Sequence, residues 1–105
     1  MEMSEILKKQ EILKKGLLQI LFDKSKPITP RELYDSSLQI HGYKVTRING
    51  IVSDIDVLGI SITVSRLIKD GFFEVKEPDT YEGNMWSHQY ICITEQGKSY
   101  YNQIK

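Results

Sequence analysis

The sequence lacks the features that identify several large classes of protein. It has a single cysteine, Cys92, so no disulfide can form within the chain, and a reducing compartment is its natural setting. We read Cys92 as a small apolar side chain in a strand-like run. No apolar stretch approaches the roughly 20 residues that a membrane-spanning helix needs. The N-terminal segment has no uninterrupted apolar core, so it does not read as a signal peptide. We therefore expect a cytoplasmic protein without a membrane partner.

An excess of positive charge and a recognisable catalytic cluster are also missing. Fourteen basic residues balance fourteen acidic ones, which excludes a strongly basic coat for nucleic acid. Any DNA binding must therefore rest on local charge or on a dimer that concentrates it. No histidine or cysteine lies at metal-ligand spacing from His41, and no nucleophile–base set or glycine-rich phosphate loop stands out. We expect no metal, no cofactor and no enzymatic activity.

The composition is that of a globular protein, and the length of 105 residues indicates one domain, residues 1–105. A first helix is predicted over residues 4–22, because side chains of one face recur at spacings of three and four. Its stripe is long for so small a domain, so part of it can pack on a second subunit. The stripe comprises Ile6, Gln10, Leu13, Leu17, Ile20 and Leu21. Lysines 8, 9, 14 and 15 lie mostly off this face, as solvated surface or as a phosphate-contacting patch.

Two further helices are indicated before the middle of the chain. Thr29, Pro30 and Glu32 form a start signal for a helix over residues 30–41, which Gly42 ends. His41 is expected at the end of its buried side. Next, Thr46 caps a predicted helix over 46–58 that Gly59 ends, with Gly50 inside it for no evident reason. In that helix one face carries Ile48, Ile51, Val52, Ile55 and Leu58, and the other carries Arg47, Asn49, Ser53, Asp54 and Asp56.

Residues 60–68 fit two structures. As a strand, Ile60, Ile62 and Val64 alternate with polar residues, and the β-branched content favours it. As a helix, Ser61 is the N-cap, one side is apolar, and a polar face remains for a ligand. A strand is expected over 72–77 and another over 85–93, which contains Trp86. The loop 78–84 joins them, and Thr94 caps a last helix.

This order of elements is that of a winged helix-turn-helix, and four motifs deepen the resemblance. LGIS (58–61) with TVSR (63–66) resembles the turn and recognition-helix start of many bacterial and archaeal regulators. LIKDGFFE (67–74) is similar to the junction between recognition helix and wing. ITEQGK (93–98) and ITPREL (28–33) are similar to segments of MarR-like and PadR-like repressors. The resemblance covers most of residues 12–104. It implies an α+β fold, mostly helical, with a β-hairpin wing and a C-terminal helix.

The spacing departs from those regulators, which leaves a second alignment open. About one helical turn is missing between LGIS and DGFF, and one helix is in excess before the wing. If 46–58 is the recognition helix and strands begin at 60, the chain resembles winged-helix domains of the archaeal replication-initiator type. Either alignment implies a winged helix.

The resemblance implies a protein that binds double-stranded DNA sequence-specifically. It would be a transcriptional repressor acting as a homodimer through the first and last helices. In the first alignment the expected DNA contacts are Ser61, Thr63, Ser65, Arg66 and Lys69, with Arg66 suited to guanine or phosphate. In the second they are Lys44, Thr46, Arg47 and Asn49, although Asp54 and Asp56 would then repel the DNA backbone. The acidic loop 78–84 and the zero net charge favour an alternative, a winged-helix protein-interaction module with little or no DNA reading.

Overall fold

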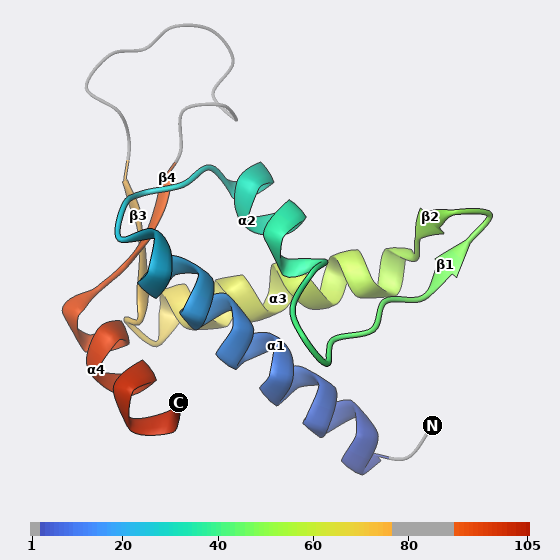
Figure 1. Ribbon diagram of the computed structural model, residues 1–105, viewed down its shortest axis with the longest axis horizontal. Coiled ribbons are helices and arrows are strands. Elements are labelled where there is room, and N and C mark those ends of the chain that lie inside the picture. The colour runs from blue at the N-terminus through green and yellow to red at the C-terminus, as the bar shows by residue number, and fades with distance from the viewer. Residues whose placement is uncertain (1–2, 77–89) are drawn as a thin grey trace, which may run out of the picture.

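The computed structural model describes residues 3–76 and 90–105 (Figure 1). Within them, the chain forms an α+β fold of four helices and two small antiparallel hairpins. In chain order the elements are α1 (Met3–Lys24), α2 (Pro30–Ser37), β1 (Arg47–Ile48), β2 (Ile51–Val52), α3 (Asp54–Lys69), β3 (Phe73–Lys76), β4 (Tyr90–Ile93) and α4 (Glu95–Ile104).

Helix α1 lies at the centre of the fold and confirms the first predicted helix. It crosses α3 and also contacts α2, β4 and α4 (Figure 1). Its inner face is almost completely buried, with Leu13, Leu17, Leu18 and Leu21 at most 2% exposed. These four leucines are a third of the twelve buried apolar residues that form the core of the described chain. The stripe that suggested a second subunit is thus covered by the chain itself over this part of α1.

Helix α2 begins where the sequence predicts and ends earlier. The Thr29 hydroxyl accepts a hydrogen bond from the Glu32 amide at 3.2 Å. The helix stops at Ser37, so the predicted end at His41 is wrong, and His41 is exposed. The chain turns instead, which brings Ile40 against α1 at Gly16. A Cβ on Gly16 would lie 2.5 Å from Ile40 Cγ2, so this close contact explains the glycine that weakens α1.

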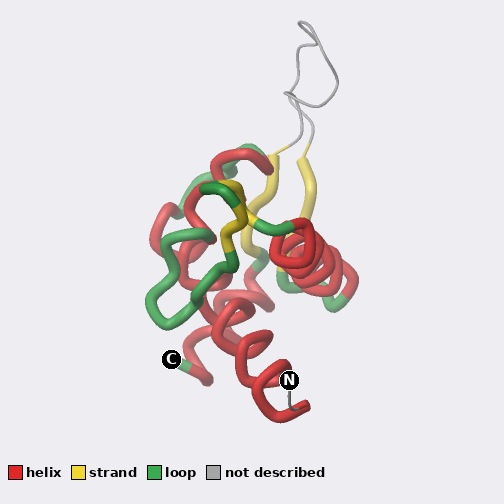
Figure 2. The backbone as a smooth tube through the Cα atoms, turned by 90° about the vertical axis from the view of Figure 1, so that its right-hand side faces the viewer, coloured by secondary structure: helices red, strands yellow, loops and turns green. Residues whose placement is uncertain are grey.

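The predicted helix over 46–58 is wrong for residues 46–53, and only residues 54–58 are helical, as the start of α3. Residues 47–52 form the β1–β2 hairpin, in which Arg47 pairs with Val52 and Ile48 with Ile51. Asn49 and Gly50 form its turn with φ angles of 53° and 80°. Two consecutive positive φ angles are the requirement of a type I′ turn, for which Asn-Gly is the preferred pair. Gly50 is therefore a turn residue, and the helical spacing of the surrounding aliphatics is coincidental. Viewed from the right-hand side of Figure 1, this hairpin lies nearest the reader (Figure 2).

Residues 60–68 are helical, so the strand interpretation is wrong. They form the second half of α3, which begins seven residues before the predicted N-cap Ser61. Ser53 is the actual cap, and its hydroxyl accepts from the Asp56 amide at 3.4 Å. Gly59, predicted to end a helix, lies inside α3. Gly71, with φ 84°, ends the helix and redirects the chain into β3.

The second hairpin pairs β3 with β4 and is closed by a third segment. Phe73 lies opposite Ile93, and Lys76 opposite Tyr90. Ile28, between α1 and α2, forms a single antiparallel bridge to Ile91 through two hydrogen bonds of 3.0 and 2.7 Å. Thr94 caps α4 as predicted, its hydroxyl accepting from the Gly97 amide at 3.0 Å. The predicted loop over 78–84 and the strand residues 85–89, including Trp86, lie outside the described residues.

Candidate functional site

The two sets of predicted contact residues lie on α3 and on the hairpin that leads into it. In the C-terminal half of α3, Ser61, Ser65, Arg66 and Lys69 are exposed. Together with Ile62 they line a shallow depression of about 260 Å³. Thr63 is the exception in this set, because it is half-buried and its hydroxyl donates to the Gly59 carbonyl at 2.8 Å.

The second set belongs to the β1–β2 hairpin and the segment before it, and not to a recognition helix. Lys44, Thr46, Arg47 and Asn49 are all exposed. The Arg47 guanidinium donates to the Gly50 carbonyl across the turn at 3.5 Å. The hairpin projects beyond the N-terminal end of α3, whereas β3 follows its C-terminal end (Figure 1). The first set therefore lies on the C-terminal half of α3, and the second set lies beyond its N-terminal end.

The basic members of both sets form no ion pair within the described part of the chain. The salt bridges there join Lys9 to Asp56, Lys76 to Glu74, and Lys98 to Glu95. Lys44, Arg47, Arg66 and Lys69 thus present their charges to solvent. Unpaired cations at both ends of an exposed helix can attract an anionic partner.

Asp56 belongs to a buried network, so its predicted outward position is wrong. Its carboxylate is 4% exposed and accepts from the Lys9 amine at 2.7 Å, the Thr46 amide at 2.7 Å and the Ser53 hydroxyl at 3.0 Å. Burial alone would raise the pKa of Asp56, but these hydrogen bonds and the Lys9 charge outweigh it and lower the pKa. Of the two acids expected to repel DNA, only Asp54 remains exposed.

Tyr43 completes this network. Its hydroxyl donates to Asp56 at 3.5 Å, and the Lys9 amine lies 5.2 Å from its ring centroid. Burial, followed by the Asp56 charge and hydrogen bond, raises the pKa of Tyr43 to about 12. The network fixes α1, the segment before β1 and the first turn of α3 to one another. The spacing Ser53-x-x-Asp56, a variant of the capping box, is the sequence signal that identifies it.

The lysines of α1 divide into two kinds. Lys9 is held by Asp56, and Lys14 donates to the Tyr100 hydroxyl at 2.8 Å with its amine 4.7 Å from that ring's centroid. Lys8 and Lys15 are exposed. Two members of the possible phosphate patch are therefore tied to other helices.

One face of α3 also carries exposed aliphatic side chains, of which the predicted helix 46–58 placed Ile55 and Leu58 on its apolar face. Ile55 is 82% exposed, Leu58 59% and Ile62 44%. Ile48 and Ile51 of the hairpin are 64% and 72% exposed. Positions 55, 58 and 62 share one helical face because they are three and four residues apart. The sequence did not indicate this exposed stripe.

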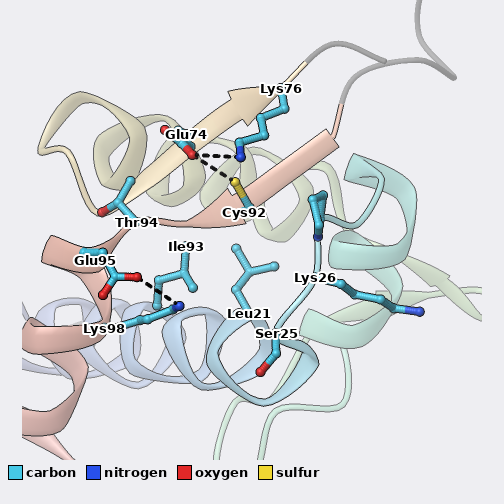
Figure 3. Close-up of a pocket in the computed structure, with 11 residues that line it drawn as sticks. Leu21, Ser25, Lys26, Glu74, Lys76, Cys92, Ile93, Thr94, Glu95 and Lys98 are labelled. Atoms are coloured by element: carbon cyan, nitrogen blue, oxygen red, sulfur yellow. Dashed lines mark hydrogen bonds and ion pairs between the residues drawn. The ribbon is translucent and has the colours of Figure 1, made fainter. Parts of the chain in front are cut away.

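A crevice of about 430 Å³ lies between the end of α1, the β3–β4 hairpin and α4. Figure 3 shows the Glu74 carboxylate joined by dashed lines to both the Lys76 amine and the Cys92 sulfur, with Glu95 beside Lys98. Its acidic groups are thus paired with neighbouring lysines. Burial, and then Glu74, raise the pKa of the Cys92 thiol, which keeps it protonated and poorly nucleophilic. The crevice gives no indication of a reactive centre.

Among residues 3–76 and 90–105, no group of three or more His, Cys, Asp or Glu side chains could hold a metal ion. The helices described there are also too short or too polar to cross a membrane. Comparison of the chain with protein-family models, curated proteins and solved structures finds no match. Its function must therefore be argued from its own residues.

Proposed function

We propose that the chain is a winged helix-turn-helix protein that binds double-stranded DNA as a cytoplasmic transcriptional regulator, a repressor. The order of elements supports this: α1, the Ile28 bridge, α2, α3, the β3–β4 hairpin and α4. In this assignment α3 is the recognition helix and β3–β4 the base of the wing. The β1–β2 hairpin between α2 and α3 is an addition to that order.

The observation that carries the proposal is the exposed polar strip on the C-terminal half of α3, whose basic groups form no ion pair with residues 3–76 or 90–105. Arg66 presents a planar fork of donors that suits guanine or phosphate. Lys69, one turn further, suits phosphate, and the hydroxyls of Ser61 and Ser65 can donate to phosphate or base edges. A helix that enters the major groove requires such an unobstructed polar strip.

The hairpin residues extend the same interface beyond the start of α3. Lys44 and Arg47 can contact phosphates, while Asn49 at the turn tip can contact a base edge. The sets that the sequence presented as alternatives then act together, at opposite ends of one helix. Of Asp54 and Asp56, the two acids expected to repel DNA beside the second set, Asp56 is buried and paired with Lys9.

Fluorescence anisotropy with labelled random-sequence duplex DNA, measured over a range of salt concentrations, tests the proposal. We expect micromolar affinity that falls steeply with salt, because phosphate contacts release counterions. Arg66→Ala with Lys69→Ala should weaken binding by roughly tenfold or more and lower the salt slope by about two. Arg47→Ala should weaken it less.

Lys24→Ala with Lys26→Ala removes the same charge from exposed positions at the end of α1 and just after it, and should leave binding nearly unchanged. Absence of salt-sensitive binding at micromolar protein, or equal losses in the two double variants, contradicts the proposal. A selection for preferred sequences with the wild-type chain would then test whether base edges are read.

A second candidate function is a protein-interaction module, and the exposed Ile55, Leu58 and Ile62 favour it. Apolar side chains gathered on one face commonly mark a protein contact.

A homodimer through the first and last helices stays a prediction. The leucines 13, 17, 18 and 21 of α1 and Tyr101 of α4 are buried inside the chain, and Leu7 is an exposed aliphatic residue of α1.

A further inference from the structure

The exposed aliphatics are concentrated in one short part of the chain. Five of the seven large apolar side chains that are exposed in the described part of the chain lie between Ile48 and Ile62. Scattered exposed aliphatics are ordinary on a protein surface. Three on one helical face, preceded by two on the adjoining hairpin, are not scattered, and they require an apolar surface to cover them.

Gly59 lies in the middle of this face. It follows Ile55 by four residues and precedes Ile62 by three, so all three point to the same side of α3. A Cβ at Gly59 would meet nothing within 4 Å, so no contact inside the chain requires glycine there. Glycine in a helix interior lowers helix stability. What it leaves is a flat position where the backbone of another helix can approach closely.

The charges on this face are arranged so that it complements itself. Asp54 lies at its N-terminal end, and Arg66 and Lys69 lie at its C-terminal end. Two copies placed antiparallel about an axis near Gly59 bring each Asp54 close to the other copy's Arg66. A parallel arrangement would bring like charges together. In the antiparallel arrangement the positive end of each helix macrodipole also lies beside the negative end of the other, which is favourable.

The same antiparallel arrangement matches the shape of the face. Leu58 of one copy falls opposite Ile62 of the other. Ile55, the most exposed aliphatic, falls near Ser65 and so over the shallow depression lined by Ser61, Ile62, Ser65, Arg66 and Lys69. A surface that meets itself across a two-fold axis is the usual basis of a homodimer.

We propose that a second copy of this chain packs antiparallel on the exposed face of α3. Because α3 is only 16 residues long, the contact is small and the association is weak and dependent on concentration. If the proposed function holds, the pairing covers Arg66 and therefore competes with DNA for the same face. Self-association itself requires no DNA binding.

Sedimentation equilibrium without DNA, over about 10 μM to 1 mM protein, tests the pairing. We expect the average mass to rise from the monomer mass of 12.2 kDa toward twice that value. Leu58→Asp should weaken the association at least tenfold. Val75→Asp makes the same change at an exposed aliphatic of β3 and should have no effect. Circular dichroism confirms that each variant is folded.

Charge exchange tests the antiparallel arrangement. Asp54→Lys alone, and Arg66→Glu with Lys69→Glu, should each prevent self-association because like charges then meet at both ends. An equimolar mixture of the two variants should associate again, because every facing pair is then of opposite charge. A wild-type monomer at 1 mM, association that survives Leu58→Asp, or a mixture that stays monomeric would overturn the inference.

The DNA measurement separates this inference from the proposed function. If the chain pairs and binds DNA, added duplex should shift the wild-type chain from the pair to a one-chain complex. Pairing without DNA binding refutes only the proposed function. DNA binding by a chain that never pairs refutes only the present inference.

Discussion

Replacement of Asp56 tests how the candidate site is positioned. In Asp56→Ala, the carboxylate that accepts from Lys9, Thr46, Ser53 and Tyr43 is lost. A hydrogen bond to a charged group contributes about 1.5–3 kcal/mol, and disruption of a buried ion pair costs about 3–5 kcal/mol. The Lys9 side chain is 37% exposed, so water can hydrate its amine after the change. We therefore expect a loss of about 2–4 kcal/mol in the free energy of unfolding.

Thermal and urea unfolding measure this loss. For a chain of this size we expect a fall of roughly 10–25 °C in Tm. Asp54→Ala is the matched control, since Asp54 is exposed and its position in the first turn of α3 is worth less than about 1 kcal/mol. If the two variants lose equal stability, the network does not fix α1 to α3 in the way its geometry indicates.

The contribution of Asp56 to the free energy of unfolding also depends on pH, and it decreases as the pH falls. Its pKa is lowered on folding, so the unfolded chain binds the proton more tightly than the folded chain. The stabilisation is therefore present above the unfolded pKa of about 3.9 and is lost as the pH falls through the folded pKa. The difference in stability between wild type and Asp56→Asn should shrink below about pH 4. A constant difference down to pH 2 would refute the assignment.

Two further predictions concern the packing around two glycines and the stability of the fold at alkaline pH. Gly97→Ala places a Cβ against the backbone carbonyl of Phe72 and 2.7 Å from Ile93 Cγ1, so it should lower the unfolding free energy by about 2–3 kcal/mol in urea titrations. Gly59→Ala, which meets nothing, should instead stabilise by up to about 1 kcal/mol, and equal effects would contradict this reasoning. Folding raises the pKa of Tyr43 to about 12, so stability should decline as the pH rises from about 10 toward 12. The stability of Tyr43→Phe should decline less than that of the wild type between pH 9 and 11. An equal decline in both would show that Tyr43 is not the source of the pH dependence.

The parts of the fold that the sequence predicts correctly are those set by local rules. Thr29 and Thr94 start helices because their hydroxyls satisfy the first free amides, and this chemistry needs no tertiary context. The α1 stripe is readable because four leucines recur at helical spacing. The ends of helices are less predictable: α2 stops at Ser37, the turn after it places Ile40 against Gly16, and this contact is not visible in the sequence around it.

The error over residues 46–58 arose from two signals in conflict. The aliphatics from Ile48 to Leu58 recur at helical spacing, yet Asn49-Gly50 is a strong hairpin signal. The local turn signal prevailed, and Ser53 was free to cap α3. Because helix and hairpin place these aliphatics differently, the same error hid the exposed stripe and the burial of Asp56.

The central position of α1 has a consequence for the synthesis of the protein. Within this sequence, α1 is synthesised before the groups that cover it, among them Asp56 and Tyr100, which is 86 residues from its partner Lys14. An isolated helix of this length is only marginally stable in water. Its leucines therefore stay partly exposed, or are shielded by a chaperone, until α3 and α4 have been synthesised. A chain truncated before α4 should leave this helix uncovered on one side and susceptible to aggregation.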